Sequence, residues 1–409
     1  MSDTSRNITP LGDVRVARYL DLDVVADVEG ADAPPFTRAE YEDRLTRIRA
    51  SLAQRGADAV LVFRPSSVDY LCGYHSAETA PQPLLVTADD LYLYVLDLEI
   101  GRALASSNVT NVLYCDYSTM HRALESVAGH VAAVLPSGAT VALENSATGT
   151  PPMMTTMLVG AGLTPVDGDA LVERCRLVLS EAEIGYVEQA AAVTQRGVEA
   201  AVAAARQGGT DAQVGAAITQ ALIEQANSRS AWGPVVATGS RGGIAHSTWR
   251  NGPLLGEVTF TEFAGTHFRY HAPVMRTLGH GEPSDKIRRL EGLAQTALGE
   301  VLAGAKPGVT VSDVARSAIA AMGPLHDDEV FHFMFGYPIG LAHPPHWMDG
   351  APFFISTANH GQFEAGMTFH MPGSMRSFGR AGVGLSQTFT VEHGGTRVLT
   401  HGAAEIIPL

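Results

Sequence analysis

Hydrophobic positions first follow a helical period in the stretch TRAEYEDRLTRIRASLAQRG, where Thr37 and Glu40 form a capping-box pattern. The apolar residues of this stretch that would share one helical face are Tyr41, Leu45, Ile48 and Leu52. Short apolar runs follow and alternate with helical stretches such as 118–134; the runs are ADAVLVF, PLLVT, LYLYVL, NVLY and TVALE. This alternation predicts an α/β domain with a covered sheet, over residues 36–178.

A second pattern begins at Ser180 and Glu183, another capping box, which opens an Ala-rich helix to about Arg206. Further helices are predicted at 211–227, 284–304 and 311–322, and strands at 257–264, 267–272, 366–371 and 382–391. We expect the strand at 267–272 to end at Pro273, because proline has no backbone N–H to donate. The chain from 179 to 409 is therefore predicted to be a second domain, of α+β type.

Residues 1–35 end in GADAPPF, and the pair of prolines disfavours a helix there. We expect this segment to be an arm that lies on the body of the protein or on a neighbouring subunit. The predicted organisation is thus an arm at 1–35 and two domains at 36–178 and 179–409.

Composition fits this division, since 409 residues exceed one ordinary domain and a hydrophobic fraction of 45% can form large cores. A formal net charge of −15 makes nucleic acid and anionic membrane surfaces unlikely partners. The three cysteines, Cys72, Cys115 and Cys175, are widely separated and indicate buried thiols in a reducing compartment. No run resembles a signal peptide or a membrane span, so we expect a cytoplasmic protein.

Histidine is unevenly distributed, because all of the 15 histidines except His75, His121 and His130 follow residue 240. Six of the later ones lie in four separate segments, GGIAHSTW, THFRYHAP, GLAHPPHW and MTFHMPG. None has a zinc-type spacing such as HExxH. Polar chemistry is therefore expected in the second domain, where the fold would have to bring these segments together.

These segments resemble the creatinase and aminopeptidase P superfamily, whose catalytic domain has the pita-bread fold. The likeness extends from about Phe36 to the C-terminus. Within the superfamily, TFTEFAGTHFRYHAPVMRT, AHSTW, GYPIGLAHPPHW and EAGMTFHMPG are most similar to the ectoine hydrolase subgroup, and creatinase is more distant. Two departures from that subgroup, His346 and Gln387 where the resemblance implies acidic residues, leave the substrate open.

The resemblance also implies where metal would be bound. Metal-dependent members hold two divalent ions with two Asp, one His and two Glu. The matching positions here are Glu262, Pro273, Tyr337, Met371 or Pro372, and Ser386. A single carboxylate cannot hold a two-metal cluster, so we expect no metal and no other cofactor.

Without a metal, hydrolysis needs general acid–base catalysis by side chains. His246 matches the proton-shuttle histidine of creatinase-like enzymes, Glu262 would orient it or bind a cation, and His271 would donate to a carbonyl or carboxylate. The expected substrate-binding residues are Tyr337, His343, His346, Trp249, Trp347, His370 and Arg276, with one of His343 and His346 solvated and with Arg276 anchoring a carboxylate. Structural roles are expected for His267, His280, His326, His332, His360, His393 and His401.

The sequence therefore predicts a metal-independent hydrolase that cleaves a C–N bond of a small polar or zwitterionic compound, such as a cyclic amidine, an amide or a guanidine. Two alternatives stay open at this point: a lyase, decarboxylase or cyclase on the same fold, and a catalytically inactive binding protein. The resemblance further implies a homodimer in which the segment 73–83 reaches the active site of the partner.

Overall fold

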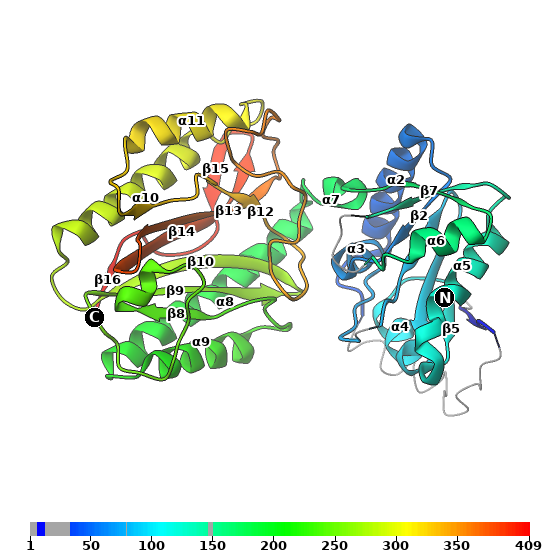
Figure 1. The fold of residues 1–409 in the computed structure, drawn as a ribbon, viewed down its shortest axis with the longest axis horizontal. Coiled ribbons are helices and arrows are strands. Elements are labelled where there is room, and N and C mark those ends of the chain that lie inside the picture. The colour runs from blue at the N-terminus through cyan, green and yellow to red at the C-terminus, as the bar shows by residue number, and fades with distance from the viewer. Residues whose placement is uncertain (1–5, 13–32, 79, 146–149) are drawn as a thin grey trace. The chain divides into compact units, whose positions relative to one another are not determined.

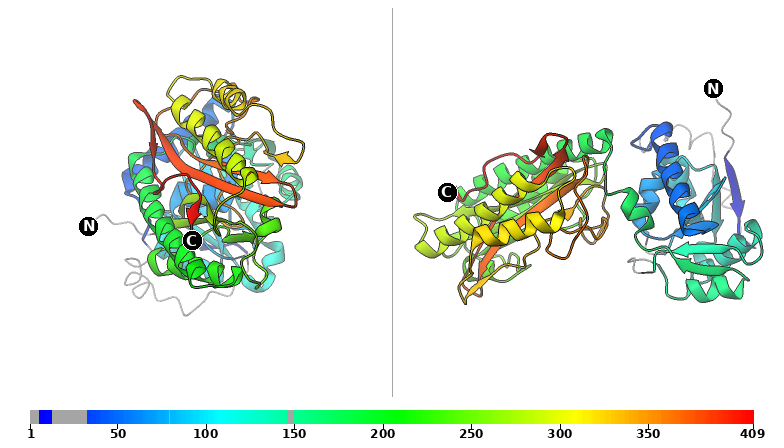
Figure 2. Two further views of the ribbon diagram at one scale, coloured as in Figure 1. Left: turned by 90° about the vertical axis from the view of Figure 1, so that its left-hand side faces the viewer. Right: turned by 90° about the horizontal axis from the view of Figure 1, so that it is seen from above.

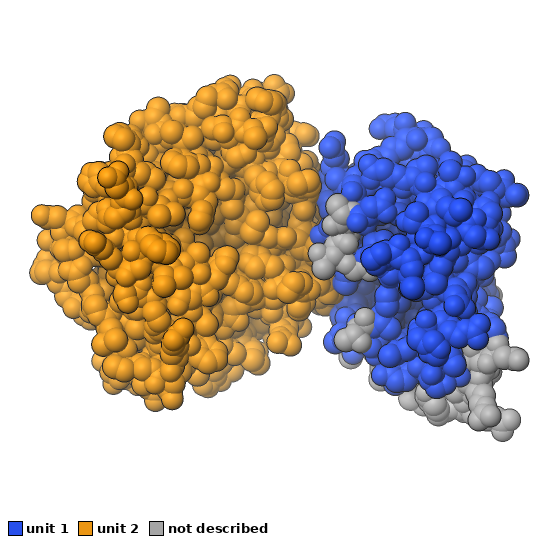
Figure 3. Space-filling view, in the orientation of Figure 1, with its two compact units in different colours: residues 1–175 blue, residues 176–409 orange. Residues whose placement is uncertain are grey.

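The computed structural model describes residues 6–12, 33–78, 80–145 and 150–409. The chain divides into two compact units, 1–175 and 176–409, which Figure 3 shows in two colours. No helix among the described residues is long and apolar enough to cross a bilayer. Each unit has its own sheets and core, and the two are described separately.

The first unit is built on a seven-stranded sheet with the order β1-β5-β4-β3-β2-β6-β7 (Figure 1). Its strands are β1 (Asn7–Pro10), β2 (Ala59–Val62), β3 (Leu84–Thr87), β4 (Leu91–Leu96), β5 (Asn111–Cys115), β6 (Thr140–Leu143) and β7 (Thr164–Asp167). Strand β1 pairs in parallel with β5, so part of the segment predicted to be an arm is an edge strand of this sheet. The rest of that segment, 13–32, lies outside the described residues.

The helices of the first unit are α2 (Arg38–Arg55), α3 (Pro65–Cys72), α4 (Ile100–Ser106), α5 (Ala123–Val134), α6 (Met154–Gly160) and α7 (Leu171–Cys175), with short 3-10 helices η1 (Asp97–Glu99) and η2 (Tyr117–Arg122). At the start of α2 the Thr37 side chain accepts a hydrogen bond from Glu40 N, and the four apolar side chains predicted for one face are buried. Gly56 ends the helix in the left-handed region at φ 67°, which glycine adopts without a steric penalty. The helix is therefore as the sequence predicts.

The second unit contains two sheets that are each covered by a pair of helices (Figure 1). One sheet has the order β16-β10-β9-β8 and the other β11-β13-β14-β15, with β12 on β13. The strands are β8 (Val235–Thr238), β9 (Val258–His267), β10 (Tyr270–Gly279), β11 (Glu329–Val330), β12 (Tyr337–Pro338), β13 (Thr368–Ser377), β14 (Ala381–Glu392), β15 (Gly395–Val398) and β16 (Ile407–Pro408).

Four helices, α8 (Glu181–Arg206), α9 (Asp211–Gln225), α10 (Asp285–Gly304) and α11 (Val311–Met322), accompany these sheets, with a short 3-10 helix η3 (Gly239–Gly243). Helix α8 begins with the predicted capping box, since Ser180 and Glu183 exchange side-chain and backbone hydrogen bonds. It packs on β9 and β10, whereas α10 packs on β13 and β14. Figure 2 shows the yellow helices α10 and α11 beside the orange strands of that second sheet. Apolar side chains between these layers form the core.

The expectation that Pro273 ends its strand is wrong, because β10 continues to Gly279. The backbone N–H groups of His271 and Met275 point away from β9, to Gly340 O and Ser386 Oγ. Pro273 lies midway between these residues and has the same alternation, so its missing N–H removes no bond to β9. The proline is thus tolerated at an edge of the strand where side chains and loops take over the hydrogen bonding.

Candidate active site

The second unit has a cavity of about 260 Å³ between its two sheets and three loops. Its floor comes from β9, β10, β12 and β13, and the loops at 245–246, 331–334 and 346–348 complete it. The lining residues are Ala245, His246, Glu262, Met275, Phe331, His332, Met334, Tyr337, His346, Met348, Pro372, Ser374 and Arg376. Four of the predicted site residues therefore meet here: His246, Glu262, Tyr337 and His346.

Strand register explains which side chains face this cavity. Glu262 on β9 pairs with Met275 on β10, and residues directly opposite each other share a face. Pro372 on β13 pairs with Ser386 on β14, whereas Met371 points to the other face, into the hydrophobic core. The position that was left open between Met371 and Pro372 is therefore occupied, on the cavity side, by Pro372.

Glu262 is a buried carboxyl group, only 5% exposed, and it has no hydrogen bond or ion pair with any described residue. Burial raises the pKa of Glu262 to about 8, and the positive charge of Arg376 opposes that rise. The carboxyl group is thus mostly protonated at neutral pH and can donate a proton. A neutral, unpaired acid inside a cavity is a typical feature of a catalytic or ligand-binding position.

His246 lies at the edge of the same cavity, in the loop after η3. It is exposed and has a positive φ of 58°, a conformation that is uncommon for a residue other than glycine. The ring of Trp232 packs edge-on against the imidazole, with ring centroids 5.6 Å apart. Partial burial lowers the pKa of His246, and the charges of Arg376 and His332 lower it further. At neutral pH the imidazole is therefore neutral and able to accept a proton.

A buried hydrogen-bond chain runs beside the cavity through Trp347, Tyr337, His370 and Ser386. Trp347 Nε1 donates to Tyr337 Oη at 2.9 Å, and Tyr337 Oη lies 2.6 Å from His370 Nδ1. His370 Nε2 lies 2.7 Å from Ser386 Oγ, which also accepts from Met275 N at 2.6 Å. Burial lowers the pKa of His370 to about 3, and the charges of Arg276 and His346 act in the same direction. The ring is thus neutral, and the chain is a satisfied internal network.

Of the two histidines that flank the prolines, His346 lines the cavity and His343 is buried elsewhere. The ring of Trp232 lies against His346, with centroids 4.7 Å apart, and His346 Nδ1 accepts from Met348 N. Burial lowers the pKa of His346 to about 4, with a further contribution from His246. His346 is therefore a neutral group with Nε2 left for a ligand.

Sequence comparison assigns both parts of the chain. Residues 185–393, just over half of the chain, match the metallopeptidase family M24, and residues 44–178 match the creatinase/prolidase N-terminal domain. The chain belongs to metallopeptidase family M24. This family membership confirms the superfamily expected from the sequence, and it makes the protein one of a family of hydrolases.

Individual members of family M24 are similar over most of their length. Ectoine hydrolase of Halomonas elongata is 28% identical over 363 residues, which cover 83% of this chain and 90% of that protein. Xaa-Pro dipeptidase of Pyrococcus horikoshii is 23% identical and covers 73% of this chain and 82% of its own. Each of these activities belongs to the relative named.

Solved structures of family M24 proteins share the fold. The prolidase from Pyrococcus horikoshii OT3 superposes with a TM-score of 0.74 at 20% identity, covering 89% of this chain and 100% of its own. Dipeptidase PepE from Mycobacterium ulcerans gives a TM-score of 0.77 at 23% identity, over 91% of this chain and 100% of its own. The predicted fold class, a creatinase-type N-terminal domain followed by a pita-bread domain, is confirmed.

The metal pair of family M24 does not fit the residues of this chain. At the five ligand positions, Pro273 and Pro372 offer no side-chain donor atom. The oxygens of Tyr337 and Ser386 are both engaged with His370, and each also accepts an N–H bond. Glu262 is the one carboxylate, and hard divalent ions need several oxygen or imidazole ligands. The donor set therefore cannot hold two metal ions in the manner of the family.

A different cluster of metal-binding residue types occurs among the described residues, formed by His326, Asp328 and Glu329. It lies outside the cavity. Lys286 binds both carboxylates, and Arg289 makes two further hydrogen bonds to Glu329. The negative charge that would attract a cation is thus already neutralised by protein side chains.

His271 requires a correction. It shares a strand face with Pro273, as alternation predicts, but it does not line the cavity. Its Nδ1 lies 2.8 Å from Arg269 O and its Nε2 accepts from Ala231 N at 2.9 Å, so the ring has no donor left for a ligand. Burial lowers the pKa of His271 to about 4. The His271 side chain therefore links the start of β10 to the loop at Ala231 by hydrogen bonds.

Arg276 and Trp249 also lie away from the cavity lining. The Arg276 guanidinium donates to backbone oxygens of Met275, Ser386 and His401 and to the Gln387 amide, so the expectation that it anchors a carboxylate is wrong. Trp249 is 48% exposed. Trp347 and His370 support the cavity from behind, through the hydrogen bonds to Tyr337.

Three polar residues that line the cavity were missed by sequence reasoning, His332, Ser374 and Arg376, as was Trp232, whose ring packs against His246 and His346. His332 was assigned a structural role, but it lines the cavity. The sequence did contain a signal for Ser374 and Arg376, because they follow Pro372 at intervals of two along a strand. Strand alternation would have placed them on the cavity face. Trp232 offered no such signal, since its loop approaches the site only through the fold.

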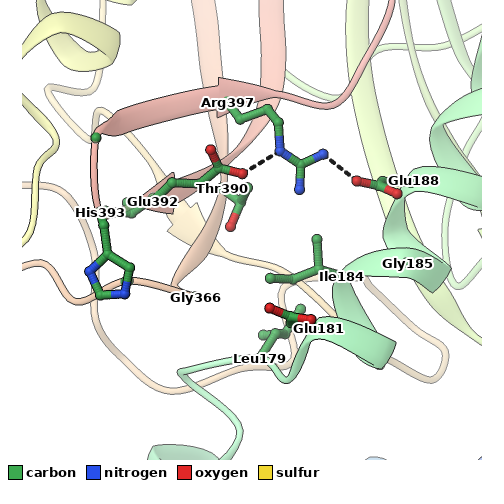
Figure 4. A pocket seen from close by; sticks show the side chains of 13 residues that line it. Leu179, Glu181, Ile184, Gly185, Glu188, Gly366, Thr390, Glu392, His393 and Arg397 are labelled. Atoms are coloured by element: carbon green, nitrogen blue, oxygen red, sulfur yellow. Dashed lines mark hydrogen bonds and ion pairs between the residues drawn. The ribbon is translucent and has the colours of Figure 1, made fainter.

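A second, larger cavity of about 620 Å³ lies in the same unit, between the start of α8 and the β14–β15 turn (Figure 4). Exposed carboxylates line it, at Glu181, Glu188 and Glu392. Its arginine, Arg397, already binds Glu188 and Glu392, as the dashed lines in Figure 4 show. This surface hollow contains none of the predicted site residues, and its arginine is already paired with two of its three glutamates.

Proposed function

We propose that this family M24 protein hydrolyses a C–N bond of a small polar or zwitterionic compound, of cyclic amidine, amide or guanidine type, without a metal. The observation that carries the proposal is the contrast between the metal positions and the rest of the cavity. Two of those positions are prolines and two are tied into a hydrogen-bond network, whereas His246 and Glu262 remain with no hydrogen bond to another described side chain.

The two remaining groups are suited to opposite steps of acid–base catalysis. His246 is neutral at pH 7 and would take a proton from water as the water oxygen bonds to the substrate carbon. Glu262 is protonated and would give its proton to the nitrogen that leaves as the C–N bond breaks. A proton returned from His246 through solvent restores Glu262, so atoms and charge balance over the cycle. Environments that separate the pKa values of two groups commonly mark such acid and base roles.

The substrate class is supported by the relatives and by the size of the cavity. Ectoine hydrolase of Halomonas elongata is among the similar proteins, and its name describes hydrolysis of a small molecule. The cavity of about 260 Å³ lies just below the range of roughly 300–1,000 Å³ that is common for sites of drug-sized ligands. A compact substrate therefore fits the proposal better than an extended peptide.

Isotope incorporation tests whether the reaction is hydrolysis. The protein would be incubated in heavy-oxygen water with a panel of cyclic amidines, amides and guanidines, and products would be analysed by mass spectrometry. Hydrolysis predicts one heavy oxygen atom in the product at the carbon of the cleaved bond. A product that forms without the label would instead support lyase, decarboxylase or cyclase chemistry. Absence of any product across the panel would favour a binding protein.

The resemblance also leads us to propose a homodimer in a cytoplasmic setting, with the segment 73–83 of one subunit contributing to the partner's active site. Residue 79 of this segment lies outside the described residues. Sedimentation velocity of the purified chain would measure the mass in solution, and a monomer at micromolar concentration would contradict the dimer.

A further inference from the structure

Arg376 is a buried cation that faces the active-site cavity. Its side chain lines the active-site cavity and is 6% exposed, yet it makes no hydrogen bond or ion pair with any described residue. Its Nε is fully buried and unpaired. The ring of Phe260 lies 5.5 Å from the guanidinium carbon and gives only weak cation–π support. An unpaired buried charge is costly, and a folded protein retains one chiefly where a ligand completes it.

Ser374, two residues earlier on β13, also lacks a hydrogen-bond partner among the described residues. Its Oγ is buried and has no hydrogen-bond partner, and the residue also lines the cavity. Because strand side chains alternate, Ser374 and Arg376 point to the same face of β13. Two neighbouring donors thus project into one space and are left unsatisfied by the described protein.

Glu262 does not supply the missing anion. It lines the same cavity, but among the described residues no hydrogen bond or ion pair joins its carboxyl group to Arg376. The nearby histidines, His246, His332 and His346, cannot supply a negative charge. The cavity therefore has a net requirement for one negative group beside Arg376.

We infer that Arg376 and Ser374 bind a carboxylate of the substrate and so limit the substrates of this site to small carboxylic acids. The inference rests on the proposed function, since it describes the substrate of that same cavity. Arginine binds carboxylates well because its planar N–H groups match the two oxygens, and the serine hydroxyl adds a further donor.

The rest of the cavity defines the body of that acid. Apolar side chains cover the remaining wall, and they are Met275, Phe331, Met334 and Met348. Thioether side chains adapt to the shape of a compact ring or short chain. With the carboxylate fixed at Arg376, the scissile C–N group would lie toward Glu262 and His246. A carboxylate at one end and a cleavable nitrogen group at the other describe a small amino-acid derivative.

Binding can be measured apart from turnover in the His246→Ala variant. Titration calorimetry would compare ectoine, a cyclic amidine that carries a carboxylate, with its primary carboxamide, and benzoate with benzamide. The amides keep the shape and remove the charge. We expect at least one acid to bind tenfold or more tightly than its amide, since a hydrogen bond to a charged group is stronger than one to a neutral group.

Substitutions assign any such preference to a residue. In the same background, Arg376→Gln should abolish the preference for the acid, Arg376→Lys should keep part of it, and Ser374→Ala should reduce it. Arg397→Gln is the matched control, because Arg397 lies in the second cavity, and it should leave the preference unchanged. Circular dichroism and melting curves would establish that each variant folds. If Arg376→Gln does not fold, the effect of Ser374→Ala on the preference for the acid decides the question.

The possible outcomes separate the inference from the proposed function. Equal binding of acids and amides, no binding of either, or an acid preference that survives Arg376→Gln would overturn the carboxylate site, even if the wild-type protein hydrolyses some neutral compound. An acid preference that depends on Arg376, in a protein that cleaves none of the tested C–N bonds, would support the site and overturn hydrolysis instead.

Discussion

Two sides of one cavity differ in how their polar groups are satisfied. On one side Tyr337, His370 and Ser386 form a closed chain in which each group has a protein partner. On the other side Glu262 and Arg376 are also buried, at 5% and 6% exposed, and neither side chain has a hydrogen bond or ion pair with a described residue. The resemblance implies that both sides lie at or beside positions that hold metal ligands in metal-dependent members of the superfamily.

This difference distinguishes polar residues that stabilise the fold from polar residues that would bind or convert a substrate. Satisfied buried polar groups stabilise one arrangement of the fold, and removing a member leaves its neighbours unpaired. Unsatisfied buried groups reduce stability, and they are typical of sites where a ligand completes them. We therefore assign the Tyr337 side to scaffold and the Glu262 side to substrate.

The largest effect is expected for His246→Ala. Removing a general base costs about 10²–10⁴ in rate, whereas an exposed loop histidine contributes little to stability. The variant should therefore lose turnover and keep the wild-type melting temperature, as measured by steady-state kinetics and calorimetry. His360→Ala, at an exposed histidine outside the cavity, is the matched control and should be active. A variant that turns over normally but melts earlier would return His246 to a structural role.

Glu262→Gln should lose turnover and gain stability. Because the folded pKa of about 8 exceeds the unfolded value, the folded state holds a proton that the unfolded state lacks between about pH 4.5 and 8, so stability falls as pH rises through this window. Glutamine does not ionise, so the variant should melt at a higher temperature than wild type at pH 8 and at the same temperature near pH 4. For wild type, kcat/KM should decline above about pH 8. Lower stability of the variant at pH 8 would mean that Glu262 is a structural acceptor.

Tyr337→Phe should show the opposite balance. The phenyl ring keeps the volume but leaves Trp347 Nε1 and His370 Nδ1 without their partner, and each unmet buried group costs about 1–3 kcal/mol. Urea unfolding should therefore show a clear loss of stability, with turnover reduced less than in His246→Ala. Tyr117→Phe, at an exposed tyrosine, should be neutral. If Tyr337→Phe is stable but inactive, the network belongs to the chemistry.

The smallest kinetic effect is expected for His271→Phe. Both ring nitrogens bind backbone groups, so the substitution should lower the free energy of unfolding by about 1–3 kcal/mol and leave KM nearly unchanged. Chemical denaturation and substrate titration measure the two quantities. A tenfold rise in KM without loss of stability would show that His271 reaches the substrate after all.

Local features of the fold were predictable because they depend on neighbouring residues. The capping boxes, the buried face of α2 and the helices near 284–304 and 311–322 follow from short-range patterns. Pro273 was misjudged because the cost of a missing N–H depends on which edge of the strand it faces, and register decides that.

The candidate site was predictable only in part. His246 and Glu262 were found through the resemblance of their segments to the superfamily. Arg276 was predicted to bind a carboxylate and Arg376 was not considered, because sequence shows that an arginine lies in or near a strand but not which groups surround it. The Arg276 guanidinium donates hydrogen bonds to backbone oxygens, whereas the Arg376 guanidinium has no hydrogen bond with any described residue. Only the three-dimensional arrangement distinguishes a satisfied charge from an unsatisfied one.

We propose that this cavity uses side-chain acid–base chemistry in place of a metal pair, and elemental analysis would distinguish the two. Protein purified without affinity metal would be incubated with manganese, cobalt, iron and zinc salts, dialysed, and measured for metal per chain, with activity assayed before and after chelation. We expect no stoichiometric transition metal and unchanged activity in chelator, because the positions at Pro273, Tyr337, Pro372 and Ser386 lack free ligands. Two tightly bound ions per chain, with activity that chelation removes, would contradict it.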